Sequence, residues 1–109
     1  MKFVLISRHT NGAEVPESET EQNLKALGEW LAPVNVQQAM PIRGGISVTA
    51  TGAEQYNGDI GGIIVFEAAN LEQAVAIAKK SPGLKYGFTH EVLPEISMNE
   101  ASQSKVKTA

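Results

Sequence analysis

Two histidines are the first residues to consider for chemistry, because imidazole is the side chain whose ordinary pKa lies closest to neutral pH. They are His9, which follows an apolar run beside Arg8, and His90, which lies in a later run of apolar and aromatic residues. Asp59 lies in a glycine-flanked segment and has the carboxylate that orients a histidine in catalytic dyads and triads. His9, Asp59 and His90 are therefore the candidate catalytic residues.

Each candidate also has an ordinary structural interpretation. No motif fixes a partner for His9, which favours a solvated histidine at a strand end as the alternative. His90 alternates with Phe88 and Val92, which is typical of a hydrogen-bonded histidine on a packed or dimer surface. Aspartate beside glycine is common in turns for conformational reasons alone. Both interpretations stay open for all three residues.

Two arginines and two glutamates form a second set of candidates. Arg8 and Arg43 are candidate ligand-binding residues, because the guanidinium donors match carboxylate or phosphate groups. A surface arginine near a glycine pair is the alternative for Arg43. Glu67 and Glu91 are expected on neighbouring strands, where paired carboxylates raise one another's pKa, or at a solvated rim.

Several classes of site are excluded or disfavoured by composition. The chain has no cysteine, and its two histidines are not accompanied by other ligands at metal-binding spacing, so we expect no metal site. No glycine pattern matches a phosphate loop or dinucleotide fingerprint, so we expect no cofactor. The net charge of −3 and the scattered basic residues argue against nucleic acid as a partner. The apolar runs are too short for a membrane span or a signal-peptide core, which makes the cytoplasm the expected location.

The first half of the chain predicts a strand, a helix and a strand pair. The run 3–6 is apolar without alternation, as in a strand covered on both faces. Ser18 and Glu21 have capping-box spacing, and the leucines that follow recur at helical intervals up to Pro33. We expect strands at 34–42 and 46–49, joined by a glycine-rich turn, and then a polar loop over 50–59.

The second half predicts a strand, a helix and a last strand. Residues 63–66 are again apolar on both faces. Asn70 and Gln73 have capping-box spacing before a helical stripe, which the segment 81–83 ends. A strand is expected over 86–93. Residues 1–96 thus form one domain, and 97–109 are expected to be a mobile polar tail.

This order is that of an α+β, ferredoxin-like βαββαβ domain with an antiparallel sheet and both helices on one face. The strands at 3–6 and 63–66 are apolar on both sides, yet so short a chain has no third layer to cover the second face. An exposed apolar face of this kind is larger than monomers normally carry. A partner chain's sheet is the simplest cover, so we expect a homodimer.

The second half also resembles a known family. Residues 61–68, the segment 70–74 and the strand ending 91–94 are similar to the YCII-related proteins, particularly their DGPF-like branch. The resemblance implies a dimeric α/β barrel, in which two ferredoxin-like sheets face each other around a cavity, and an active-site role for a His-Asp pair. The predicted first helix has no histidine, Thr51-Gly52 stands at the Asp-Gly-Pro-Phe motif, and Leu93 replaces the usual arginine.

Three functions are compatible with these observations. The first is binding of a small organic molecule in a cavity between the dimer sheets. The second is a cofactor-free isomerase, lyase or hydrolase that uses a His/Asp pair, which requires the two side chains to converge in one pocket. The third is a structural assembly domain without a ligand.

Overall fold

The computed structural model describes residues 1–102 and has a mixed α+β fold built on one four-stranded antiparallel sheet. Its strands are β1 (Lys2–Arg8), β2 (Asn35–Pro41), β5 (Ile60–Glu67) and β6 (Thr89–Pro94). They lie in the order β2-β5-β1-β6, with β5 and β1 in the centre. This order is that of the ferredoxin-like fold, so the predicted fold class is confirmed.

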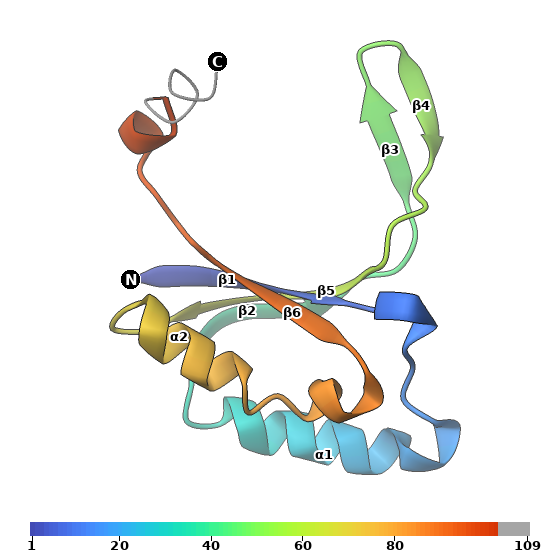
Figure 1. The fold of residues 1–109 in the computed structure, drawn as a ribbon, viewed down its shortest axis with the longest axis vertical. Coiled ribbons are helices and arrows are strands. Elements are labelled where there is room, and N and C mark those ends of the chain that lie inside the picture. Colours follow the sequence, from blue (N-terminus) through green and yellow to red (C-terminus); the bar gives the residue numbers. More distant parts are fainter. Residues whose placement is uncertain (103–109) are drawn as a thin grey trace.

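Both helices cover the same face of this sheet. α1 (Thr20–Leu31) and α2 (Leu71–Ala78) lie side by side below it in Figure 1, together with the short 3-10 helix η3 (Pro82–Tyr86). Two further 3-10 turns, η1 (Thr10–Gly12) and η2 (Glu17–Glu19), connect β1 to α1. No helix in residues 1–102 is long and apolar enough to cross a membrane.

The register shows why the two faces of the sheet differ. Phe3 pairs with Phe66 and Leu5 with Ile64, and these side chains point toward the helices. The alternating residues point to the opposite face, which we call the open face; its centre is formed by Val4, Ile6, Ile63 and Val65. The helix-covered face holds the core, whose buried side chains are Phe3, Leu5, Phe66, Ala74 and Ala78.

The predicted strand pair at 34–42 and 46–49 is wrong. β2 pairs with β5 instead, and β3 (Ile46–Thr49) forms a separate hairpin with β4 (Gly52–Gln55), inside the segment predicted as a loop. Gly44 and Gly45 have φ values of 69° and 123°, a conformation that disfavours other residues, and they turn the chain out of the sheet. The hairpin stands on the open-face side, away from the helices (Figure 1).

The two predicted helix caps had different outcomes. Asn70 caps α2 as expected, since its side chain accepts a hydrogen bond of 2.8 Å from the Gln73 backbone N–H. The Ser18–Glu21 box does not form, because the chain makes the 3-10 turn η2 first and α1 begins at Thr20 without a side-chain cap.

The last strand and the tail also differ from the expectation. β6 begins at Thr89 rather than at residue 86, because η3 and then Gly87, with φ 96°, occupy the preceding positions. Within the expected tail, residues 98–102 are helical and stand on the open-face side (Figure 1). The rest of that tail, 103–109, lies outside the described residues. The boundary at 96 and the mobility of the tail stay predictions.

Candidate functional site

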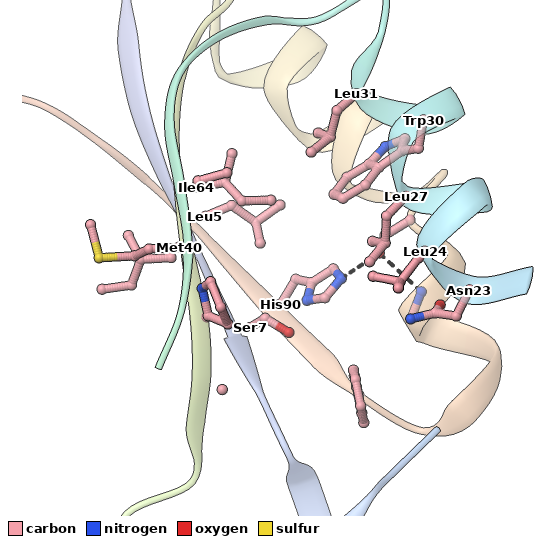
Figure 2. Close-up of a pocket in the computed structure, with 18 residues that line it drawn as sticks. Leu5, Ser7, Asn23, Leu24, Leu27, Trp30, Leu31, Met40, Ile64 and His90 are labelled. Atoms are coloured by element: carbon pink, nitrogen blue, oxygen red, sulfur yellow. Dashed lines mark hydrogen bonds between the residues drawn. The ribbon is translucent and has the colours of Figure 1, made fainter. Parts of the chain in front are cut away.

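A cavity of about 320 Å³ lies between α1 and the helix-covered face of the sheet. Leu24, Leu27, Trp30 and Leu31 line it from α1, one helical turn after another, and Leu5 and Ile64 line it from the sheet. Figure 2 shows these side chains facing each other across the cavity. Leu24 is largely exposed, so it lies at the mouth. The walls are therefore mainly apolar, and one chain forms them by itself.

Polar groups gather at one end of this cavity. Ser81 and His90 line it together, and their side chains form a hydrogen bond of 2.7 Å between Oγ and Nε2. Ser7 and Asn23 line it as well, from β1 and α1 (Figure 2). The Asn23 Oδ1 is buried and has no hydrogen-bond partner within residues 1–102. An unpaired buried carbonyl costs about 1–3 kcal/mol, which a donor on a ligand would recover.

Local sequence positions the Ser81–His90 pair. Ser81 precedes Pro82 and caps η3, where its Oγ accepts a hydrogen bond of 3.2 Å from the Gly83 backbone N–H. His90 points to the helix-covered face because it pairs with Ser7 in the register of β1 and β6. The Trp30 ring is stacked near the His90 imidazole at 6.3 Å between centroids. Trp30 is itself held by a hydrogen bond of 2.8 Å from its Nε1 to the carbonyl of Ile77.

His90 is in its neutral form at neutral pH. Burial lowers the pKa of His90 below its ordinary value of 6.5, and the hydrogen bond to Thr89 opposes this shift to a smaller extent. The His90 Nδ1 lies 3.0 Å from the carbonyl oxygen of Thr89, which can only accept. Nδ1 therefore carries the proton, and Nε2 accepts from the Ser81 hydroxyl.

The other predicted residues lie at two different places. His9 and Arg43 line a second, more polar depression of about 670 Å³ with Glu14 and Glu17. The His9 Nδ1 bonds to the Ala13 carbonyl at 2.9 Å, and its ring packs edge-on against Phe88 at 4.9 Å.

Arg8 and Asp59 lie on the open-face side instead. The Arg8 guanidinium donates to Asp59 at 2.7 Å and to Glu91 at 2.5 Å. These bonds, to Glu91 first, raise the pKa of Arg8 above its ordinary value. Arg8 therefore binds two carboxylates of its own chain.

The structure does not form a His/Asp pair. The Asp59 carboxylate bonds to Arg8, and His9 meets Asp59 through the backbone, where the His9 N–H donates to the Asp59 carbonyl at 2.7 Å. Nor do Glu67 and Glu91 form a carboxylate pair, because β1 lies between β5 and β6. Glu67 accepts a hydrogen bond from Asn35 instead.

Sequence reasoning missed most of the cavity. The sequence pattern predicts Ser81 only as part of a helix end, and no pattern indicates Asn23 or Ser7. A serine directly before Pro82 does signal a cap, but its contact with His90 spans nine positions and depends on how η3 turns back to β6.

Comparisons with known proteins agree with this architecture. The sheet order and the two helices on one face define a ferredoxin-like α+β domain, and the profile of the YCII-related domain matches residues 1–94. The chain belongs to the YCII-related family. None of the curated proteins matches it.

A solved structure with the same fold is 5-chloro-2-hydroxyhydroquinone dehydrochlorinase (TftG) from Burkholderia phenoliruptrix AC1100, in complex with 2,5-dihydroxybenzoquinone. The TM-score is 0.58 at 18% sequence identity, and the match covers 92% of this chain and 98% of that chain. At this identity the likeness shows a common fold.

Proposed function

We propose that this protein binds a small, uncharged, mainly apolar organic molecule in the cavity between α1 and the sheet. The observation that carries the proposal is the cavity itself, whose apolar walls converge on a small polar end. Its volume of about 320 Å³ is at the lower end of the usual range for ligand pockets, which fits a single ring with short substituents.

The lining also specifies the polarity of the ligand. It contains no lysine, arginine, aspartate or glutamate, so a charged ligand would lose its hydration without gaining an ion pair. The unpartnered Oδ1 of Asn23 calls for a hydrogen-bond donor on the ligand, such as a hydroxyl group. The hydroxylated single ring named for the TftG complex is of this size class.

Fluorescence of Trp30, the single tryptophan of the chain, provides a binding test. We expect p-cresol to change this fluorescence saturably and 4-methylbenzoate, which has the same ring but carries a charge, to bind much more weakly. Ala39 lines the cavity from β2 at an exposed position, so we expect the larger ring of Ala39→Phe to obstruct the cavity and weaken binding. Ala32→Phe, at the exposed C-terminal end of α1, is the matched control that keeps binding. Equal affinity for the charged compound, or unchanged binding by Ala39→Phe, contradicts the proposal.

We further propose that the protein is a homodimer assembled through the open face. Val4, Ile6, Ile63 and Val65 form an apolar centre on a face that no element of residues 1–102 covers, and the β3–β4 hairpin and residues 98–102 border it (Figure 1). A second copy brings an identical apolar face, which makes a self-complementary contact. Such an assembly would place Arg8, Asp59 and Glu91 near the interface, and it is the dimeric arrangement expected from the sequence.

Light scattering of two valine variants tests this assembly. Val65→Asp buries a charge at the centre of the proposed interface, so we expect a folded monomer. Val75→Asp makes the same change on the outer side of α2 and should stay dimeric. A Val65→Asp variant that remains a dimer contradicts assembly through the open face.

A further inference from the structure

The arrangement of Ser81 and His90 is suited to catalysis as well as to ligand binding. The Ser81 hydroxyl donates to His90 Nε2 at 2.7 Å, and His90 Nδ1–H donates to the Thr89 carbonyl at 3.0 Å. A hydroxyl, an imidazole and an acceptor behind the imidazole form the nucleophile–base–orienter arrangement of covalent catalysis. Here the orienting group is a backbone carbonyl, in the place where a catalytic triad has a carboxylate.

We propose that Ser81 is a catalytic nucleophile and His90 its general base, and that the pair hydrolyses small uncharged esters held in the α1 cavity. The inference rests on the proposed function, because the ester must occupy that cavity. Both residues line it, and its apolar walls accept a short acyl group and a single ring. The ester carbonyl is the class of group that an activated serine attacks.

The surroundings keep the pair in place. Ser81 is only 7% exposed, and its Oγ is fixed by the Gly83 N–H as well as by His90. Pro82 restricts the backbone directly after the nucleophile. The half-buried imidazole is neutral, so it can accept a proton without first losing one.

The reaction balances without a cofactor. Ser81 Oγ bonds to the ester carbonyl carbon while its proton passes to His90 Nε2, and the carbonyl oxygen becomes an oxyanion. Asn23 lines the same cavity, and turning its side-chain amide over would direct its N–H groups, which are of the type that stabilise an oxyanion, toward the reacting carbonyl. The C–O bond to the leaving group then breaks, and the alcohol takes the proton from His90. Water repeats the attack on the acyl-serine, which releases the acid and restores Ser81.

Two features limit the rate and therefore the choice of substrate. The Gly83 N–H uses a lone pair of the attacking oxygen, which lowers its nucleophilicity. The Thr89 carbonyl stabilises an imidazolium less than a carboxylate does. We therefore expect slow turnover that favours aryl esters, whose phenolate leaving groups depart readily.

Hydrolysis of p-nitrophenyl acetate by the full chain tests the inference. We expect a burst of p-nitrophenolate and, by mass spectrometry, an acetyl group on Ser81. Ser81→Ala and His90→Gln should each lower the rate at least about 100-fold, since a positioned base contributes roughly that much or more. Ser47→Ala, on the β3–β4 hairpin, should hydrolyse at the wild-type rate. Ser81→Cys should still become acylated, because a thiol replaces the hydroxyl as nucleophile.

Binding of phenylacetone, a non-hydrolysable ketone of similar shape, separates the two proposals through Trp30 fluorescence. Wild type and Ser81→Ala should both bind it, which also shows that the variant is folded. Binding without ester hydrolysis overturns the role of Ser81 and leaves the proposed function standing. Absence of binding overturns both. Acetylation of a lysine in place of Ser81, or loss of hydrolysis in His9→Gln but not in His90→Gln, also overturns the inference.

Discussion

The two faces of the same sheet use alternating residues of the same strands, yet they present different chemistry. On the helix-covered face, Phe3 and Phe66 are buried and the cavity ends at a neutral Ser81–His90 pair. On the open face, partly exposed aliphatic side chains lie beside the charged cluster of Arg8 with two carboxylates. Elements of the same chain cover the first face, whereas no element of residues 1–102 covers the second, for which we propose a second copy as the partner. The proposed ligand site therefore needs one chain only, and the proposed assembly needs two.

The largest expected difference between the faces is in stability. Phe66, 1% exposed and packed on Phe3 at 5.9 Å between ring centroids, should cost about 3–5 kcal/mol of unfolding free energy when replaced by alanine. Val65→Ala, at the preceding position of β5, should cost less, and its cost should depend on protein concentration, because in the proposed dimer the second copy would pack against Val65. Urea unfolding at two protein concentrations measures both. A Val65→Ala effect as large as that of Phe66→Ala and independent of concentration would show that one chain completes the open face.

A second expected difference concerns the β3–β4 hairpin. Ile46 and Val48 point to the same side of β3 and are 66% and 79% exposed, which favours contact with a second copy. Replacing both by serine should weaken the proposed dimer. Sedimentation of the variant at several protein concentrations in an analytical ultracentrifuge measures this effect. Binding of p-cresol should not change, because the hairpin does not line the cavity. A tighter dimer in the variant contradicts a role for these side chains in assembly.

The next effect is a pH dependence that comes from the helix-covered face. The pKa of His90 is lower in the folded chain than its ordinary 6.5, so the unfolded chain binds the proton more readily. The contribution of His90 is therefore fully present above pH 6.5 and is lost as the pH falls below that value toward the folded pKa. Urea unfolding at pH 7.5 and pH 5 should show a smaller loss for His90→Gln than for wild type. An identical loss of unfolding free energy in both proteins would contradict this explanation.

The smallest expected effect belongs to the charged cluster of the open face. Glu91→Gln removes one of the two carboxylates that bond to Arg8. In a free chain these side chains are partly exposed, so the stability change should be slight and should disappear in high salt. In a dimer that shields them, the change should persist in salt. Thermal unfolding of wild type and of the Val65→Asp variant, each with and without Glu91→Gln and at low and high salt, distinguishes these cases.

Local patterns in the sequence determined a large part of the fold. The apolar runs specified the two central strands, the Asn70 cap and the alanine stripe specified α2, and the element order specified the ferredoxin-like class. These features depend on residues only a few positions apart, so a single amino-acid sequence is enough to recognise them. Both apolar faces of the central strands were predictable for the same reason.

The tertiary structure decided the pairing of β3 and the composition of the site. Residues 46–49 form a strand as expected, but two glycines redirect it to a partner in a segment too polar to be recognised as a strand. His9, Asp59 and His90 were identified by type, yet their side chains lie at three places, because strand register and turn geometry set side-chain direction. Ser81 meets His90 for the same reason. The sequence gives the type of each candidate residue. Whether the side chains of these residues meet depends on long-range packing, which the spacing of neighbouring residues does not determine.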